Sequence, residues 1–165
     1  MFKYNIGIIG GSTADEFYCN IAYKVGYLLS KNGCAVFCGG KTGVMECASH
    51  GVYDAGGFVA GFMPEYTKNG GNKYLSLVIP TGIGYLRNFL IIRASDALIA
   101  IDGKSGTTSE AAFALTEGKS VISIGNLNID VKEGDGKLIR VKTPEEAVER
   151  AMDEAGKYTS KFGEK

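Results

Sequence analysis

Short apolar runs alternate along this chain with longer segments in which apolar residues recur at helical spacing. A continuous apolar run bounded by glycine is typical of a strand buried in a parallel sheet, and a repeat of three to four residues is typical of an amphipathic helix. The apolar runs predict strands at residues 4–9, 35–38, 58–62, 75–79, 97–101, 120–124 and 138–141. The periodic segments predict helices at residues 15–31, 43–55, 84–94, 107–117 and 144 to about 154.

This alternation predicts an α/β fold, with a single doubly wound parallel sheet between two layers of helices. The length of 165 residues fits one domain, which we place at residues 1–155. The polar C-terminal tail at residues 156–165 is expected to fray. Residues 64–74, between the third and fourth strands, are polar and rich in turn-forming residues, and they are expected to form a loop.

Composition and charge narrow the possible partners. The 18 basic and 18 acidic residues cancel, so charge gives no reason to expect nucleic acid or an anionic membrane as a partner. The apolar run near the N-terminus is too short to span a membrane and lacks a signal-peptide pattern, so we expect a cytoplasmic protein. The 24 glycines are about twice the average usage, and they lie singly or in pairs between apolar runs.

The cysteines give no sign of a metal centre. Cys19, Cys34, Cys38 and Cys47 include no C-x-x-C pair, and His50 is the only histidine of the chain. A site built from cysteine and histidine therefore has few possible ligands, and we expect no metal. Free cysteine prefers burial, so we expect all four to be reduced, partly buried thiols.

Four glycine-rich turns, at residues 10–12, 39–43, 81–84 and 103–107, each follow a predicted strand and precede a predicted helix. Open parallel sheets bind ligands at the carboxyl ends of their strands, and the free N–H groups of helix N-termini favour phosphates. The turns therefore predict a phosphorylated small molecule as the ligand. The residues predicted to contact it are Gly10, Gly11, Ser12, Gly39, Gly40, Thr42, Gly43, Glu46, Thr81, Gly82, Asn88, Gly103, Ser105, Gly106 and Thr107.

Two of these turns contain Gly-Lys-Ser or Gly-Lys-Thr, as nucleoside triphosphate loops do. That motif also needs a glycine five residues before the Gly-Lys pair, and those positions hold Leu98 and Ala35, inside predicted strands. The dinucleotide pattern G-x-G-x-x-G fails as well, since Arg87 stands at its last position. ATP hydrolysis and ordinary NAD binding are therefore disfavoured.

Arg87 and Glu110 lie just after two of the glycine-rich turns. An arginine there could hold a phosphate or polarise a sugar hydroxyl, and a glutamate could act as acid, base or stabiliser of a sugar cation. Thr107-x-x-Glu110 is also the pattern of a capping box, in which the glutamate bonds back to the start of its helix. The same pattern at Thr143-x-x-Glu146 follows no glycine-rich turn, and we interpret it as structural. Both roles of Glu110 stay open.

Three motifs occur in a characteristic order: G-G-x-x-G-V-M-E at residues 39–46, T-G-x-G-x-x-R-N at 81–88 and G-x-x-G-T-x-x-E at 103–110. Together they resemble the Rossmann-like family once labelled lysine decarboxylase-like. That family includes the LONELY GUY phosphoribohydrolases and the molybdenum cofactor carrier proteins, and it is akin to the DNA-processing protein DprA. The resemblance covers about residues 4–125. Nothing here resembles a pyridoxal phosphate site, so lysine decarboxylation is not implied.

The resemblance implies roles for individual residues. LONELY GUY enzymes split the N-glycosidic bond of nucleoside 5′-monophosphates, and their motif implies catalytic roles for Arg87 and Glu110. Phosphate binding would fall on Gly106 and Thr107. No cofactor is required for that chemistry, and members of the family usually form dimers through helices beside the site, so a homodimer is also implied.

The sequence departs from the hydrolase motif at three positions, where Asp102, Lys104 and Asn88 replace Pro, Gly and Lys. The R-N pair at residues 87–88 and the V-M-E ending at residues 44–46 look closer to the carrier branch, whose members bind a pterin-type cofactor without clear chemistry. Two functions therefore stay open: hydrolysis of an AMP-like nucleotide, and non-catalytic carriage of molybdopterin or a related phosphorylated compound. An interaction domain with a vestigial crevice is a third.

Overall fold

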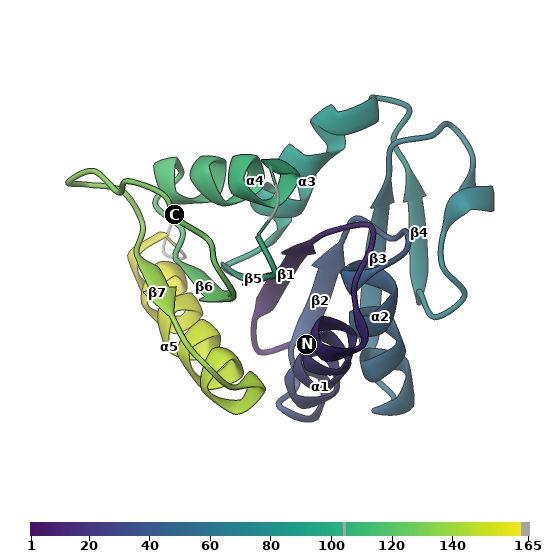
Figure 1. The fold of residues 1–165 in the computed structure, drawn as a ribbon, viewed down its shortest axis with the longest axis horizontal. Helices are drawn as coiled ribbons and strands as arrows, with labels where there is room; N and C mark the ends of the chain where they lie inside the picture. The colour runs from purple at the N-terminus through teal and green to yellow at the C-terminus, as the bar shows by residue number, and fades with distance from the viewer. Residues whose placement is uncertain (104, 163–165) are drawn as a thin grey trace.

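The computed structural model describes residues 1–103 and 105–162, and within them seven strands form one sheet (Figure 1). All neighbouring strands pair in parallel, in the order β4-β3-β2-β1-β5-β6-β7. The strands are β1 (Asn5–Gly10), β2 (Ala35–Cys38), β3 (Phe58–Met63), β4 (Leu77–Pro80), β5 (Ala97–Ile101), β6 (Val121–Ile124) and β7 (Leu138–Arg140). The helices are α1 (Glu16–Lys31), α2 (Val44–Asp54), α3 (Arg87–Ala94), α4 (Ser105–Thr116) and α5 (Pro144–Phe162), with short 3₁₀ helices η1 (Lys68–Gly70) and η2 (Gly84–Leu86).

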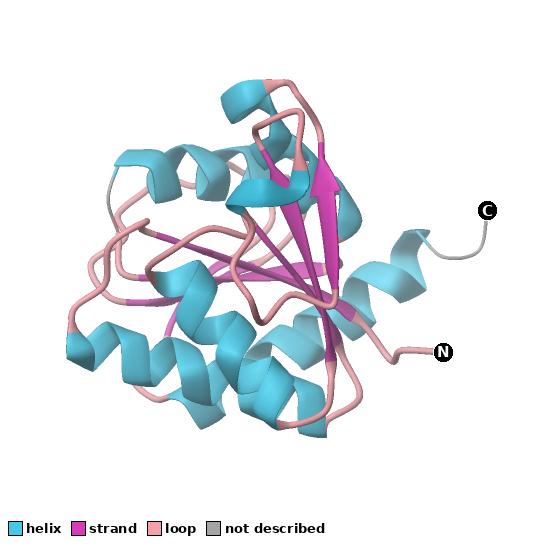
Figure 2. Ribbon diagram, turned by 90° about the vertical axis from the view of Figure 1, so that its right-hand side faces the viewer, coloured by secondary structure: helices cyan, strands magenta, loops and turns pink. Residues whose placement is uncertain are grey.

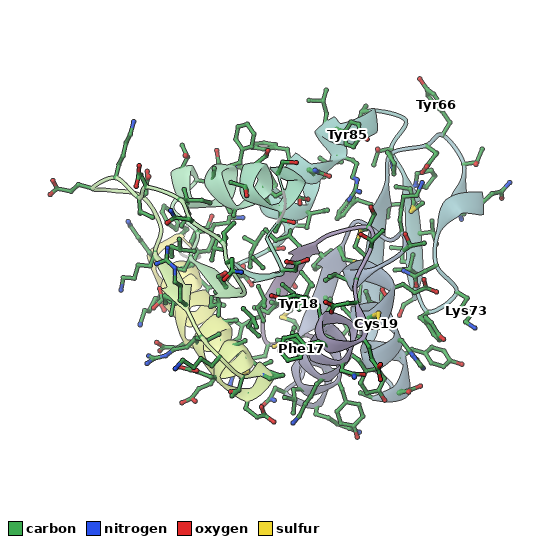
Figure 3. All side chains as sticks on the ribbon, viewed as in Figure 1. Phe17, Tyr18, Cys19, Tyr66, Lys73 and Tyr85 are labelled. Atoms are coloured by element: carbon green, nitrogen blue, oxygen red, sulfur yellow. A yellow bond between two sulfur atoms is a disulfide. The ribbon has the colours of Figure 1, made fainter. Side chains whose placement is uncertain are left out.

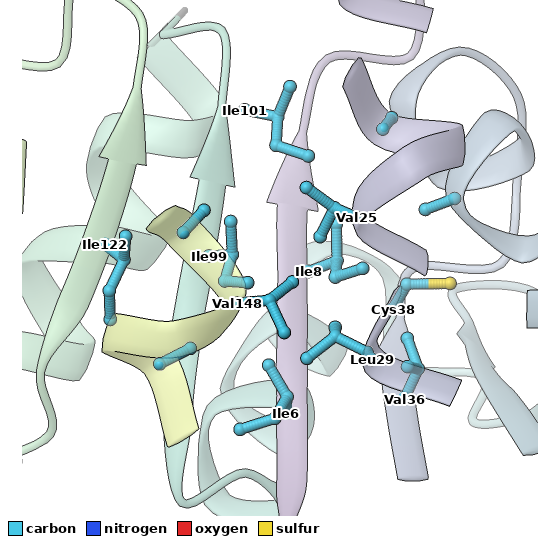
Figure 4. Packing of buried hydrophobic residues seen from close by; sticks show 14 of the residues in the cluster. Ile6, Ile8, Val25, Leu29, Val36, Cys38, Ile99, Ile101, Ile122 and Val148 are labelled. Carbon is cyan, nitrogen blue, oxygen red and sulfur yellow. The ribbon is translucent and has the colours of Figure 1, made fainter. Parts of the chain in front are cut away.

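Helices cover both faces of the sheet, with α3 and α4 on one face and α1, α2 and α5 on the other (Figures 1 and 2). Alternate side chains of β5 point to the two faces. Ile99 and Ile101 belong to the core cluster beneath α1, α2 and α5, whereas Leu98 and Ala100 belong to the cluster beneath α3 and α4. Figure 4 shows the first cluster around Ile8 of β1. The predicted three-layer α/β architecture is confirmed.

The positions of the strands agree closely with the sequence analysis. Strands β2 and β5 coincide with their predicted ranges, and the others differ by no more than two residues at either end. The helix predicted at residues 84–94 consists of η2 followed directly by α3, and the predicted loop at residues 64–74 contains η1. Among the residues that the structure describes, no helix is both long enough and apolar enough to cross a membrane.

The C-terminal segment differs from the prediction. Helix α5 continues to Phe162, so the prediction of a frayed tail is wrong for residues 156–162, which are helical (Figure 2). The ring of Tyr158 lies 4.8 Å from that of Phe162 and 5.1 Å from the Nζ atom of Lys119. The polar composition of the segment concealed these contacts, because a helix needs only a narrow apolar stripe to pack.

The four cysteines are of two kinds. Cys34 and Cys38 are buried free thiols, as predicted. Cys19 and Cys47 instead form a disulfide between α1 and α2, with their Cα atoms 5.3 Å apart, so the prediction of reduced thiols is wrong for this pair. The two residues are 28 positions apart and share no sequence motif. They meet only because the two helices lie side by side.

The order of the strands creates a crevice beside β1. From β1 the chain adds β2, β3 and β4 in one direction, and it then returns to the other side of β1 to add β5, β6 and β7. The loops that follow β1 and β5 therefore lead to helices on opposite faces of the sheet. Such a reversal of strand order opens a crevice at the carboxyl ends of the strands, where α/β proteins bind their ligands.

Helices α1 and α2 pack unusually closely through two glycines. A Cβ atom on Gly26 of α1 would clash with the carbonyl oxygen of Ala48, and one on Gly51 of α2 would clash with the carbonyl oxygen of Tyr23. The backbones of the two helices therefore touch, which sets the distance between the loops that precede them.

We predict that Gly26→Ala lowers the free energy of unfolding by about 2 kcal/mol, because the added methyl group meets backbone that cannot move aside. Urea denaturation measures the change. Gly156→Ala in α5 is the matched control: its Cβ would meet only the hydroxyl end of the Tyr4 side chain, at 2.9 Å. Equal losses in the two variants would contradict the close packing of α1 and α2.

Candidate functional site

The loops that follow β1 and β2 lie against each other at the carboxyl edge of the sheet. The backbone N–H of Val44 donates to the carbonyl oxygen of Gly11 at 3.1 Å, and the hydroxyl of Thr42 donates to the carbonyl oxygen of Ser12 at 2.8 Å. Gly43 has a φ of +67°, and any side chain there would collide with Gly11 and Ser12. The two loops therefore form one wall.

This wall, η2 with the start of α3, and the first turns of α4 surround a cavity of about 230 Å³. The residues that line it are Ile8, Gly10, Gly11, Ser12, Thr13, Gly39, Met45, Tyr85, Arg87, Asn88, Gly106, Thr107 and Glu110. Figure 3 shows Tyr85 at the outer edge of the molecule, above the ends of the strands. Because the lining comes from segments far apart in the sequence, only the folded chain assembles this cavity.

Arg87, the first residue of α3, extends its guanidinium over the backbone of Gly39. A Cβ atom on Gly39 would lie 2.6 Å from both Nη2 of Arg87 and Sδ of Met45, so only glycine leaves room for the guanidinium. The side chain is buried, and its Nε atom has no hydrogen-bond partner among the residues that the structure describes. Burial lowers the pKa of Arg87, and the charge of Glu110 opposes that shift.

Glu110 does not cap its helix. Helix α4 begins at Ser105, so Thr107 is its third residue and is buried, and the capping interpretation of Thr107-x-x-Glu110 is wrong. The same pattern at the start of α5 does form a cap. There the backbone N–H of Glu146 donates to the hydroxyl of Thr143 at 3.2 Å, and the Glu146 carboxylate accepts from the backbone N–H of residue 142 at 3.2 Å.

Instead, Glu110 is a buried acid that faces the cavity, and its side chain shares that cavity with Arg87. Burial raises the pKa of Glu110 to about 7, and the positive charge of Arg87 only partly opposes this shift. The neighbouring Asn88 adds a buried Oδ1 atom without a hydrogen-bond partner among the described residues. The cavity thus combines a cation, a titratable carboxyl group and an unpaired acceptor.

A second cavity, of about 460 Å³, adjoins the first and shares Tyr85, Asn88, Gly106 and Glu110 with it. The rest of its lining is mostly apolar: Leu86, Phe89, Ser109 and Phe113. Tyr85 is 91% exposed, and the rings of Phe89 and Phe113 meet edge to face at 6.2 Å. The whole cleft therefore has a polar end at the glycine-rich loops and an aromatic end between α3 and α4.

The structure brings about half of the predicted site residues together. Those that line the polar cavity are Gly10, Gly11, Ser12, Gly39, Arg87, Asn88, Gly106, Thr107 and Glu110. Those outside it are Gly40, Thr42, Gly43, Glu46, Thr81, Gly82, Gly103 and Ser105. Lys104, which replaces a glycine of the hydrolase motif, lies outside the described residues.

Half of the residues outside the cavity, namely Thr42, Gly43, Thr81 and Gly82, support the loops around it. Thr81 donates from its hydroxyl to the carbonyl oxygen of Met63 at 2.7 Å, and Gly82 lies under the ring of Tyr66. Glu46 lines a separate groove on the outer side of α1 and α2. Successive side chains of a helix point about 100° apart. Because Met45 faces the cleft, the next residue, Glu46, points away from it.

Sequence reasoning missed the aromatic end of the cleft. Tyr85 and Phe89 flank the predicted Arg87, and Phe113 lies three residues after Glu110, on the same side of α4. The available signal was large apolar side chains inside a motif that otherwise consists of glycine and polar residues.

Within the described residues, no group of three or more His, Cys, Asp or Glu side chains is arranged to hold a metal ion.

Comparison with known proteins identifies relatives over nearly the whole chain. The profile of the SLOG cluster4 family matches residues 3–148. An uncharacterized protein of Archaeoglobus fulgidus is 42% identical over 144 residues, which cover 87% of this chain and 91% of that protein.

Solved structures resemble this fold closely. The molybdenum cofactor binding protein of Rippkaea orientalis has a TM-score of 0.82 and 29% identity, with 91% of this chain and 96% of that chain covered. The molybdenum cofactor carrier protein of Chlamydomonas reinhardtii has a TM-score of 0.77 and 22% identity, with 93% and 98% covered. The DNA-processing protein A of Helicobacter pylori has a TM-score of 0.67 and 17% identity, with 92% and 81% covered. The last two show the fold alone.

We predict that Glu110 makes the stability of the protein fall as the pH rises. Its pKa is about 7 in the folded chain and ordinarily 4.5, so between these values the folded state binds more protons than the unfolded state. From pH 5 to pH 8 the free energy of unfolding of the wild type should therefore fall by about 2.5 kcal/mol relative to Glu110→Gln. Urea denaturation of both proteins at each pH measures this, and a constant difference would refute it.

Proposed function

This chain belongs to the SLOG cluster4 family, and from that premise we propose that it binds a phosphorylated pterin-type compound in the cleft. The compound that we propose is the molybdenum cofactor, held without chemical change. The likeness to the Rippkaea orientalis molybdenum cofactor binding protein supports this proposal. The shape of the cleft also supports it. A phosphorylated pterin has an anionic end, which suits the polar cavity, and a flat ring, which suits the aromatic cavity.

Buried polar groups without partners carry the proposal. The Nε atom of Arg87 and the Oδ1 atom of Asn88 lack hydrogen-bond partners among the described residues, and both side chains line the cavity. Each such group costs about 1 to 3 kcal/mol when it stays unpaired, and a bound ligand removes that cost. A phosphate oxygen satisfies the guanidinium, and N–H groups of a pterin ring satisfy the amide oxygen.

In this proposal, each end of the cleft binds a different part of the ligand. The phosphate would lie beside Arg87 and the glycine-rich loop at residues 10–13, where backbone can approach it closely. The pterin ring would lie among Tyr85, Phe89 and Phe113, whose faces and edges suit a flat heterocycle. Glu110, at the junction of the two cavities, would accept or donate a hydrogen bond to the ring according to its protonation.

Hydrolysis of a nucleoside 5′-monophosphate is the second candidate. One observation favours it: Arg87 and Glu110 share the cavity, and the pKa of Glu110, about 7, suits a general acid or base near neutral pH. In this alternative Glu110 would stabilise the sugar cation while water attacks it.

The homodimer implied by the sequence stays a prediction. The large apolar side chains of Tyr85, Leu86 and Phe113 are exposed around the aromatic end of the cleft. A second copy of the chain that covers them would also close this end of the cleft against water.

We predict that Arg87→Ala lowers the amount of bound molybdenum cofactor by about 10-fold, because the ligand loses a charged hydrogen-bond donor. The protein is purified anaerobically, without added thiol, from cells that make the cofactor. The ligand is released, oxidised to a fluorescent pterin and measured per mole of protein by chromatography.

Arg93→Ala is the matched control for this experiment, since Arg93 lies on the same helix but is exposed and pairs with Glu117. It should leave the bound pterin unchanged. Absence of pterin from the wild type, or an equal loss in both variants, would overturn the proposed binding site.

We predict that the protein releases no free base from AMP, GMP or CMP, because a carrier holds its ligand without breaking it. Reversed-phase chromatography of overnight reactions measures the base. If the wild type releases base and Glu110→Gln does not, the protein is a hydrolase and the proposed carrier function is wrong. Release that survives in Glu110→Gln would point to a contaminating enzyme.

A further inference from the structure

The disulfide between Cys19 and Cys47 joins the two helices that carry the loops of the candidate site. Cys19 is the fourth residue of α1, and Cys47 is the fourth residue of α2. The loop at residues 10–13 leads into α1, and the loop at residues 39–43 leads into α2. The cross-link therefore lies within about one turn of the point where each loop becomes a helix.

In the part of the chain that the structure describes, noncovalent contacts between these two loops include the hydrogen bonds from Val44 to Gly11 and from Thr42 to Ser12, and the close approach of Gly43 to Gly11 and Ser12. The backbone contact between α1 and α2 begins four residues after Cys19, at Tyr23, and one residue after Cys47, at Ala48. The disulfide is the covalent restraint at the loop end of this helix pair, so its loss would loosen the wall of the cleft and leave the helix contact in place.

The disulfide is open to a reductant. Cys19 and Cys47 are half-buried and line a groove of about 400 Å³ on the outer side of α1 and α2. Tyr74 forms one side of the groove, where its ring stacks on His50 at 4.2 Å. The groove and the polar cavity have no lining residue in common. Figure 3 labels Cys19 at α1, well away from Tyr85 at the rim of the cleft.

We propose that Cys19–Cys47 is a thiol–disulfide exchange site that controls ligand binding in the cleft. The oxidised pair holds the loops at residues 10–13 and 39–43 together and favours binding. Reduction through the outer groove separates the N-terminal ends of α1 and α2 and weakens binding. The reductant is a dithiol. The effect on binding rests on the proposed function, whereas the exchange reaction and the loosening of the loops do not.

The exchange balances without any group beyond the dithiol. One thiolate of the dithiol attacks the Sγ atom of a half-cystine, the S–S bond of the protein breaks, and the released sulfur takes up a proton. The second thiolate of the dithiol then attacks the mixed disulfide and frees the other cysteine as a thiol. Two electrons and two protons pass to the protein, and the dithiol becomes a cyclic disulfide.

The experiment treats the whole protein with dithiothreitol under native conditions and traps thiols with iodoacetamide for mass spectrometry. Without reductant, unfolded protein should label at Cys34 and Cys38 only. After reduction in the folded state, Cys19 and Cys47 should label instead, while buried Cys34 and Cys38 stay protected. Labelling of all four cysteines without reductant, or resistance of the disulfide to the dithiol, would overturn the proposal.

Amide hydrogen exchange measures the loops independently of any ligand. Reduced protein should exchange about 10-fold faster at residues 10–13 and 39–43, with α3 and α4 unchanged. The variant with both Cys19→Ser and Cys47→Ser should match the reduced wild type whatever the redox state. Cys34→Ala is the control that should keep the redox response. Equal exchange rates in oxidised and reduced wild type would overturn the proposal, even if the double variant fails to fold.

Binding is measured last, as bound pterin per mole of oxidised and of reduced protein. We expect about 10-fold less in the reduced form. If neither form binds pterin, the proposed function fails while the exchange site stands on the labelling and hydrogen-exchange results. If both forms bind equally, the proposed function stands and the control by the disulfide fails.

Discussion

The position of β1 between β2 and β5 is the constraint on which the rest of this molecule depends. Because the chain builds the sheet outward from β1 in both directions, the loops after β1 and β5 lead to helices on opposite faces of the sheet. Parallel pairing places every strand's carboxyl end at one edge, so the glycine-rich loops gather there. The cleft, its polar end and its aromatic end all follow from this arrangement, and η2, α3 and α4 supply most of the side chains that line it.

Within the cleft, the fold keeps two ionisable groups where burial disfavours the charge of each. Burial lowers the pKa of Arg87 and raises that of Glu110, and their mutual attraction offsets only part of either shift. The close approach of Arg87 to Gly39 depends on the glycine, because a Cβ atom there would collide with the guanidinium. A protein that needed only stability would have apolar side chains at these positions. A ligand that completes the missing hydrogen bonds would remove this cost, which is the physical basis of the binding function proposed above.

Much of the fold was predictable because its signals are local. All five residues of β5 are buried, so the strand is a continuous apolar run, and glycine marks its end and those of β1 and β2. The candidate site was predictable to the extent that it follows from these turns: Arg87 and Glu110 both line the cavity. The aromatic end was not, since the exposure of Tyr85 and Phe113 depends on how α3 and α4 pack, and apolar residues in a helix usually indicate a buried face.

The sequence by itself determined the class of fold, the order of strands and helices, and the edge of the sheet to which the glycine-rich turns belong. Only the tertiary structure decided that Thr107 lies inside α4, which leaves Glu110 to face Arg87, and that Cys19 meets Cys47. The physical reason is the geometry of helices. A shift of one residue in the start of a helix turns every side chain by about 100°, and local sequence sets that start only to within one or two residues. Contacts between distant segments depend in addition on how whole helices pack, and a short sequence pattern carries no information about that packing.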